Sequence, residues 1–416
     1  MKRYKLLILC LCGLVNCQSP EPAKEEPLED DAVLQDQFAG FWLGQCIANW
    51  TGLITEMDKI GNVGAVTTGD FYTREDWGGP DQPNIWSGDT ISQISPVIDF
   101  VLLPPDTIWG ADDDTDIEYI YQHLLYESDS LPLTGEQIRE GWLRHIHPEE
   151  ENYLWVSNQR ALELMLEGVT PPATSDSSRN EHYAMIDAQL TTEIFGLFAP
   201  GNSKLAVELA YLPIRTSARY EAAEIAEFNV ILYSLAAAEP RGKVARTQVQ
   251  SMAEKARKHL TNGQYPAAMY DFVKGHYDRG TPWEATRDSV YQRYQVEQRD
   301  GYNITSQNIY CNGCFAAGIN FAASLISLFY GEGDLKETIK IGALCGWDSD
   351  NPTATWGGML GYMLGQEAVE ATFGQALSDK FWIHRTRRGF ANEGYDDFAT
   401  MANKGVALRK RLANKK

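Results

Sequence analysis

The sequence has little histidine, little cysteine, few basic residues and no long apolar run beyond its start. Among 416 residues there are 7 cysteines and 7 histidines, and 36 basic residues face 57 acids, for a net charge of −21. So few histidines and cysteines suggest neither a zinc site nor a histidine-based triad. No stretch after the first fifteen residues could span a bilayer. We expect no nucleic-acid partner, because a strongly acidic protein repels polyanions.

The N-terminus has the pattern of an export signal. Basic residues in Met1–Lys5 precede a short apolar run, Leu6–Val15, as in a signal peptide. Leu14-Val15-Asn16-Cys17 resembles a bacterial lipobox, in which Cys17 is lipidated and becomes the first mature residue. The alternative is a plain signal peptide cut nearby. We predict a signal peptide over residues 1–16.

Residues 17–33 form a predicted lipidated acidic tether, because this Pro- and Glu-rich stretch is too polar to fold. Loss of residues 1–16 removes three basic residues and takes the net charge to about −24. The expected location is the bacterial cell envelope, facing the periplasm or the outside. The lipid anchor would be the only membrane contact.

Apolar residues recur at helical spacing from about residue 34 onward, and alternating strand patterns are scarce. Ile117, Ile120 and Leu124 are one such series, and Ile319, Ala323 and Ile326 are part of another, which ends at Gly331. No internal repeat or domain linker interrupts the pattern. The predicted fold is all-α, a single compact multi-helix domain over residues 34–413.

Two acidic clusters each precede a predicted helix. They are Asp112-Asp113-Asp114-Thr115-Asp116 and Asp348-Ser349-Asp350-Asn351-Pro352. Close carboxylates raise each other's pKa and resist joint ionisation, so a site built from both clusters would need cations. Oxygen ligands without histidine or cysteine fit Mg²⁺, Mn²⁺ or Ca²⁺, and the spacing excludes an EF-hand.

The small residues Thr353, Gly357, Gly361 and Gly365 follow the second cluster at four-residue spacing. They predict a helix that a neighbouring helix approaches closely. Pro352 fits the first turn of this helix, with Asn351 as its N-cap.

Both clusters resemble motifs of the ADP-ribosylglycohydrolase family, which includes the dinitrogenase reductase-activating glycohydrolases. Asp112 to Thr115 is similar to its Thr-Asp-Asp-Thr motif, and Gly346 to Asn351 to its Gly-Asp-Thr-Asp-Thr motif. The resemblance implies an all-helical fold and two Mg²⁺ or Mn²⁺ ions, with Ca²⁺ as a further option. The implied metal ligands are Asp112, Asp113, Asp114, Asp348, Asp350 and Asn351.

Ala48 to Glu56 resembles a third family stretch, a helix ending in Gly-Asp-Ala-Leu-Gly followed by a glutamate. The resemblance nominates Glu56 as the catalytic acid or base. Asn49 stands where the family has an aspartate and is a candidate substrate-binding residue.

Residues 185–193 depart from the family, whose corresponding loop is rich in glycine and holds a diphosphate. Asp187 and Glu193 would repel phosphate there, which favours an uncharged or weakly charged glycoside over ADP-ribosylated protein. Asp187 is a candidate substrate contact. Among the loop tryptophans Trp77, Trp86 and Trp109, we expect Trp86 to stack on a sugar.

The leading hypothesis is therefore a metal-dependent hydrolase of an N- or O-linked glycosidic bond, with an extracytoplasmic small molecule or glycan as substrate. The alternative is a catalytically inert, cation-stabilised lipoprotein that binds glycans or nucleosides. Cys311 and Cys314 fit a redox pair, half of a zinc site or a disulfide.

Overall fold

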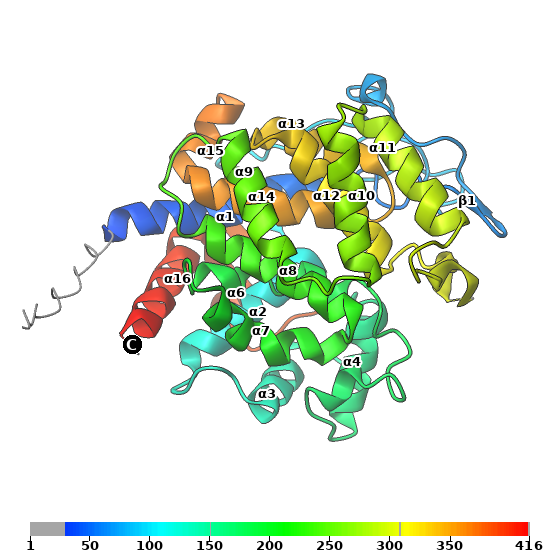
Figure 1. Cartoon of the computed structure of the whole chain (residues 1–416). Coiled ribbons are helices and arrows are strands. Elements are labelled where there is room, and N and C mark those ends of the chain that lie inside the picture. The colour runs from blue at the N-terminus through cyan, green and yellow to red at the C-terminus, as the bar shows by residue number, and fades with distance from the viewer. Residues whose placement is uncertain (1–29, 150, 308, 415–416) are drawn as a thin grey trace, which may run out of the picture.

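Helices make up most of the computed structural model, which describes residues 30–149, 151–307 and 309–414. The helices are α1 (Asp31–Gly52), α2 (Asp113–Glu127), α3 (Gly135–His145), α4 (Val156–Leu166), α5 (Asp187–Leu190), α6 (Ile194–Leu197), α7 (Ser203–Ser217), α8 (Glu221–Ala236), α9 (Arg246–Arg257), α10 (Tyr265–Asp278), α11 (Trp283–Val290), α12 (Ala317–Gly331), α13 (Leu335–Cys345), α14 (Asp350–Leu364), α15 (Gln366–Phe373) and α16 (Phe398–Ala413). The all-α fold and the single compact domain are confirmed (Figure 1).

The first helix begins earlier than the sequence pattern indicates. α1 starts at Asp31, three residues before the predicted domain start at 34, and the side chain of Asp30 caps it by accepting a hydrogen bond from the Ala32 amide. The last acids of the predicted tether are thus the cap and first turn of a helix, where the dipole favours negative charge. Cys17 and the predicted signal peptide lie outside the described residues. No described helix is both long enough and apolar enough to cross a membrane.

A close helix contact joins distant parts of the chain. α1 and α14 lie side by side (Figure 1), and glycines of one helix face glycines of the other. A Cβ atom on Gly44 would lie 2.3 Å from the Gly357 carbonyl oxygen, and one on Gly361 would lie 2.2 Å from the Gly40 carbonyl oxygen. Such backbone-to-backbone contact tolerates no side chain, which confirms the predicted close approach along the glycine stripe of α14.

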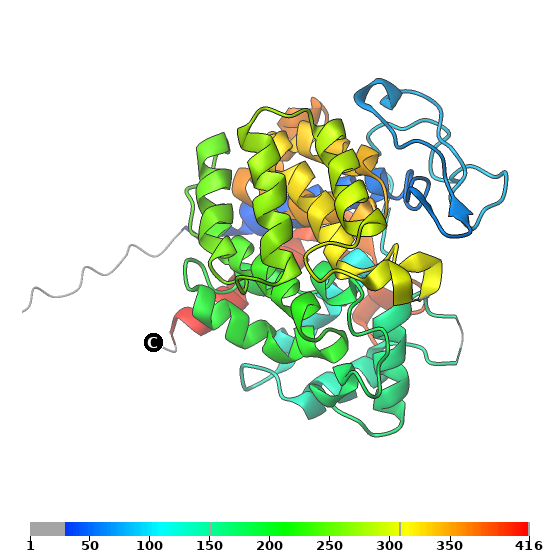
Figure 2. The same ribbon diagram turned by 45° about the vertical axis from the view of Figure 1, so that its right-hand side comes forward.

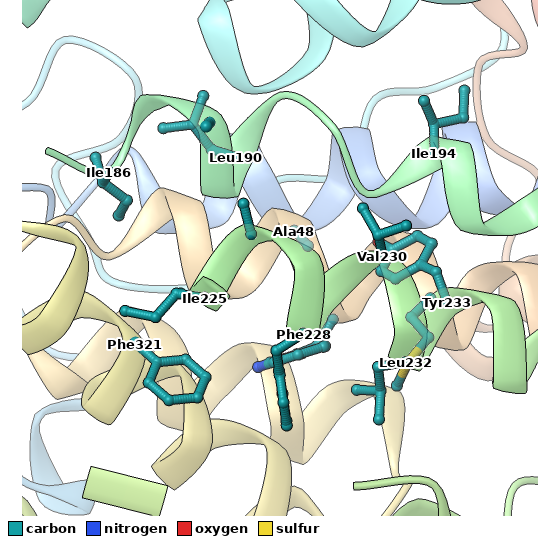
Figure 3. Packing of buried hydrophobic residues seen from close by; sticks show 14 of the residues in the cluster. Ala48, Ile186, Leu190, Ile194, Ile225, Phe228, Val230, Leu232, Tyr233 and Phe321 are labelled. Carbon is teal, nitrogen blue, oxygen red and sulfur yellow. The ribbon is translucent and has the colours of Figure 1, made fainter. Parts of the chain in front are cut away.

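α8 forms the centre of the apolar core. Figure 3 shows its buried side chains between those of α5 and α6 on one side and Phe321 of α12 on the other. Ile225, Phe228 and Val230 are fully buried. This helix fixes the α5–α6 segment, which borders the pocket described below.

A lobe of loops between α1 and α2 covers one edge of the helical body (Figure 2). It contains the hairpin β1 (Asn62–Val63) and β2 (Val66–Thr67). Where the lobe returns to the body, β3 (Trp109–Gly110) pairs in parallel with β4 (Lys380–Trp382), which pairs antiparallel with β5 (Tyr395–Asp397). This small sheet brings the chain just before Asp112 next to the C-terminal segment.

Candidate metal centre

Eight carboxylate side chains line one pocket of about 310 Å³. Six of them form two groups of three, and within each group one carboxylate oxygen of each residue lies within 4.8 Å of the others. One group is Asp112, Asp113 and Asp114, and the other is Glu56, Asp348 and Asp350. The two acidic clusters therefore meet in space although they are far apart in the chain.

The first group lies at the N-terminus of α2. This helix starts at Asp113, so most of the cluster lies in its first turn rather than before it, and Asp112 is its N-cap. Asp112 Oδ1 accepts a hydrogen bond of 2.7 Å from Asn49 Nδ2 on α1. Three successive acids can occupy this turn because the helix dipole favours negative charge there.

The second group depends on a turn with unusual backbone angles. Gly346 has a φ of 95° and Trp347 a φ of 59°, and a Cβ on Gly346 would lie 2.5 Å from the Lys59 carbonyl oxygen. The sequence predicted Asn351 as the N-cap of the next helix, but α14 starts at Asp350 with Ser349 at the cap. Asp350 therefore lies within the first helical turn.

Glu56 is attached to this turn by backbone hydrogen bonds. The Met57 amide donates to the Trp347 carbonyl at 2.9 Å, and the Trp347 amide donates to the Lys59 carbonyl at 2.8 Å. The hydroxyls of Thr55 and Ser349 lie 3.0 Å apart. Together with the glycine seam of α1 and α14, these contacts fix Glu56 beside Asp348 and Asp350.

Burial raises the pKa of all six carboxyl groups, and neighbouring negative charge adds to the effect in every one except Asp350. Burial and then Asp350 raise the pKa of Asp112 to about 8. Burial raises the pKa of Glu56 well above its usual value, followed by the charge of Asp350. The pKa of Asp350 itself rises to about 6 through burial. Without cations the groups other than Asp350 would hold protons at neutral pH, because the six carboxyl groups cannot all ionise together.

The donor set fits divalent cations with a preference for oxygen ligands. Asp112 Oδ2 and Asp350 Oδ1 are buried and accept no hydrogen bond. Among the described residues that line the pocket, Arg387 is the only one with a permanent positive charge, and its Nε lies 2.8 Å from Asp116 Oδ2 in a buried ion pair. The six carboxylates can therefore hold metal ions, and Mg²⁺, Mn²⁺ and Ca²⁺ match their oxygen atoms.

Asn351 and Asn49 lie behind the carboxylates. Asn351 Oδ1 accepts from Gln189 at 3.1 Å, while its Nδ2 donates to Asp114 Oδ1 at 3.4 Å. The oxygen that we predicted as a metal ligand is thus turned toward Gln189. Asn49 is fully buried and holds Asp112, so each asparagine orients an aspartate.

Asp187 lies in the pocket wall, whereas Glu193 does not. Asp187 Oδ1 accepts from the Asn158 amide at 2.8 Å, its Oδ2 accepts no hydrogen bond, and burial raises its pKa to about 6. Glu193 instead accepts a hydrogen bond of 2.8 Å from Thr355 in the core. Of the two acids expected to repel phosphate, Asp187 alone faces the pocket.

The three candidate tryptophans have different surroundings. Trp109 is buried and donates to the Ser378 carbonyl at 2.8 Å. Trp77 packs on Phe100 in the lobe. Trp86 stacks against Trp155 and Phe315, which both line the pocket.

Several pocket residues were given no role in the sequence analysis. Asp116 belongs to the first acidic cluster and stands one turn after Asp112, so helical spacing could have placed it beside the site. Arg387, Tyr153, Trp155 and Phe315 lie on loops that carry no local signal. Phe315 directly follows Cys314, whose disulfide with Cys311 has a Cα–Cα distance of 5.5 Å. Of the roles left open for this cysteine pair, the structure has the disulfide.

The chain is thus a helical protein with a pocket of clustered carboxylates that can hold metal ions. The sequence model of the family described as ADP-ribosylglycohydrolase matches residues 30–404. The chain belongs to this family, which is hydrolytic and typically metal-dependent.

Comparisons with individual proteins add little detail. A search of curated proteins finds no match. Among solved structures, the chain resembles one described as "ADP-ribosylglycohydrolase-related protein complex", with 15% identity and a TM-score of 0.43. That match covers 91% of this chain and 99% of the other.

Proposed function

We propose that this protein is a metal-dependent hydrolase of an N- or O-linked glycosidic bond, with an extracytoplasmic, uncharged or weakly charged glycoside as its substrate. The observation that carries the proposal is the position of Glu56, whose carboxylate lies within 4.8 Å of those of Asp348 and Asp350. A proton-transfer group beside a metal-binding set is what hydrolysis requires. A protein that only binds its ligand has no use for it.

Asp112, Asp113, Asp114, Asp348 and Asp350 would hold two divalent ions. Bound ions would supply Lewis acidity, which orients vicinal hydroxyls or water and lowers the pKa of the coordinated oxygen. Glu56 gives a proton to the leaving group or takes one from water, and its raised pKa suits the acid role. The surrounding carboxylates stabilise positive charge that develops at the anomeric carbon.

The substrate class follows from charge. The net charge is −21, and the pocket wall carries Asp187 where a diphosphate-binding loop would need amide donors. A phosphorylated substrate would meet repulsion, so we favour a neutral glycoside over ADP-ribosylated protein and expect no nucleic-acid partner. An anchor at Cys17 would place the activity in the bacterial cell envelope.

The replacement Glu56→Gln tests the catalytic role. We expect kcat to fall by about 10²- to 10⁴-fold, the usual contribution of general acid–base catalysis, with the circular dichroism spectrum and bound metal unchanged. The assay uses a glycoside panel with Mn²⁺ and with EDTA. Asp106→Asn, at an exposed loop position, is the matched control and should keep full activity. Unchanged turnover in Glu56→Gln would refute the role of Glu56, and binding without turnover in the unaltered protein would favour the inert glycan- or nucleoside-binding alternative.

A further inference from the structure

A second hollow adjoins the metal pocket. It has a volume of about 480 Å³, against about 310 Å³ for the metal pocket. Both volumes fall in the range of small-molecule sites. Tyr153, Trp155 and Val156 line both cavities. A ligand with its reacting bond at the carboxylates can therefore extend past Trp155 into the second hollow.

An aromatic patch of three rings, Trp86, Trp155 and Phe315, borders the cavities. The ring centroids are 5.8 to 6.4 Å apart in every pair, with interplanar angles of 13° to 20°. Trp155 lines both cavities and Phe315 lines the metal pocket, while Trp86 stacks on both of these rings. Phe315 is buried, whereas Trp86 and Trp155 are 38% and 42% exposed, so the accessible apolar surface of the patch belongs to the two tryptophans.

The backbone that carries this patch is strained. Tyr153 has a φ of 56° and Trp155 a φ of 54°, in the region that favours glycine. Such conformations cost on the order of 1–3 kcal/mol each and persist where the surroundings impose them. The strained backbone does not bury these two side chains, because Tyr153 remains 37% exposed and Trp155 42% exposed.

Arg387 connects the strained loop to the metal pocket. Its Nη1 donates to the Asn152 carbonyl at 2.8 Å, while its Nε pairs with Asp116 on the metal-binding helix α2. The orientation of the aromatic loop is therefore coupled to the carboxylate site. Side chains held in this way are suited to ligand contact.

The charge of the second hollow selects its occupant. Its wall carries Glu151, Glu163 and Glu181, and the Arg160 guanidinium is already paired with Glu163 at 2.9 Å. A phosphate would be repelled here. Carboxylates accept hydrogen bonds from hydroxyl groups, and the exposed indole ring of Trp155, which lines this hollow, suits the C–H face of a pyranose.

We infer that the second hollow binds a further neutral sugar ring of the substrate, which makes the substrate an oligosaccharide. The inference rests on the proposed glycosidase function and deepens it. Trp155 is the platform for this ring, Trp86 and Phe315 pack against Trp155, and the carboxylates of the hollow hold the hydroxyls.

The test measures binding without turnover, in a Glu56→Gln background with Mn²⁺. Calorimetry compares four disaccharides (maltose, cellobiose, lactose and diacetylchitobiose) with the methyl glycoside of each non-reducing sugar and with ADP-ribose. At least one disaccharide should bind about tenfold or more tightly than its methyl glycoside, equivalent to about 1.4 kcal/mol. Trp155→Ala should remove this difference, because it takes away the surface on which the second ring rests.

Tyr220→Ala is the matched control. Tyr220 precedes α8 as Trp155 precedes α4, has a φ of 54° and is 57% exposed, but lines neither cavity. It should leave disaccharide binding unchanged. If Trp155→Ala does not fold, Tyr153→Ala removes another exposed aromatic side chain that lines both cavities and should have the same effect.

Three results would overturn the inference. They are no preference for any disaccharide over its methyl glycoside, an equal preference in Trp155→Ala, and tighter binding of ADP-ribose than of every disaccharide. Failure of the proposed function has a different signature. A wild-type protein that binds disaccharides through Trp155 but hydrolyses none would refute the hydrolase and leave the subsite intact.

Discussion

Two sets of buried carboxylates lie side by side in this molecule, and they differ in their hydrogen-bond partners. In the pair Glu118 and Glu193, all four oxygens accept hydrogen bonds from protein donors, namely Gln45, the Ile194 amide, Thr355 and the Thr192 amide. In the metal pocket, Asp112 Oδ2 and Asp350 Oδ1 accept none. Burial raises the pKa in both sets.

The comparison shows that a raised pKa alone does not identify a functional acid. Glu118 and Glu193 are satisfied by the fold, as buried polar groups usually are. The pocket acids have oxygens directed toward a cavity and lack donors there. Carboxylate oxygens that accept no hydrogen bond and lie beside a cavity, rather than buried charge alone, mark the site suited to cations.

Replacing one carboxylate of each set should give the largest difference between the two sets, measured as Mn²⁺ affinity. Asp348→Asn should weaken Mn²⁺ binding by on the order of 10²-fold or more, since even residues that only support metal ligands contribute 10- to 100-fold. Glu193→Gln should leave Mn²⁺ binding unchanged. Calorimetric titration with Mn²⁺ measures both. Equal losses in the two variants would show that the sets are not functionally distinct.

Asp116 offers an intermediate case, a buried acid neutralised by a protein cation. Arg387→Gln should lower the free energy of unfolding by about 3–5 kcal/mol, because it leaves Asp116 buried without its partner. Adding Asp116→Asn should recover much of the loss. Urea denaturation of the single and double variants measures both values. A double variant as unstable as Arg387→Gln would show that the Asn152 contact, and not the charge, is what matters.

Measurements of stability against pH, with and without Mn²⁺, should distinguish the two sets of carboxylates in a single protein. The pKa of Glu193 is raised to about 7 from 4.5, and those of the pocket acids are raised as well. The unfolded chain therefore loses protons at lower pH than the folded one, and the metal-free protein becomes less stable as pH rises from about 4.5 to 8.

Mn²⁺ competes with protons for the pocket acids only. At pH 8, a hundredfold excess of Mn²⁺ over its Kd should stabilise the protein by roughly 2.7 kcal/mol, and the same Mn²⁺ concentration should stabilise it less at pH 5. The slope that remains with Mn²⁺ should become shallower in Glu193→Gln, while other acids with a raised pKa, such as Asp58 at about 8, still contribute to it. Thermal melts across this pH range test both statements, and a stabilisation by Mn²⁺ that is independent of pH would contradict the first.

The smallest expected effect comes from a change in the contact between α1 and α14, which positions the carboxylates of the pocket. Gly361→Ala should destabilise the protein by about 1–3 kcal/mol through overpacking, because its Cβ would lie 2.2 Å from the Gly40 carbonyl. It should also weaken Mn²⁺ binding by moving α1 relative to α14. In Gly275→Ala, the added Cβ meets only the flexible Arg279 side chain, so this helical control should be neutral or slightly stabilising.

Much of this architecture could be predicted from local sequence. Helical periodicity indicated the fold class, and the acid clusters drew attention to the pocket because each stands at the start of a helix. The glycine stripe on α14 predicted a close neighbour. The family resemblance added Glu56.

Long-range contacts could not be predicted in the same way. Nothing in the sequence around Arg387 indicates that it pairs with Asp116, because the loop that carries it has no periodicity. Trp155 and Phe315 meet only through tertiary packing. The sequence also could not show that Asn351 turns its oxygen to Gln189, since that choice depends on a partner from α5.

The seam between α1 and α14 also determines when the site can exist. Glu56 follows the first helix of the described chain, and its neighbours Asp348 and Asp350 belong to a segment made some three hundred residues later. A nascent chain is synthesised from its N-terminus, so Glu56 is made long before Asp348 and Asp350 and lacks these neighbours for most of translation. The pocket forms only when the last sixth of the protein folds back on the first helix. A chain truncated before residue 348 would keep Asp112, Asp113 and Asp114 but would lack Asp348 and Asp350.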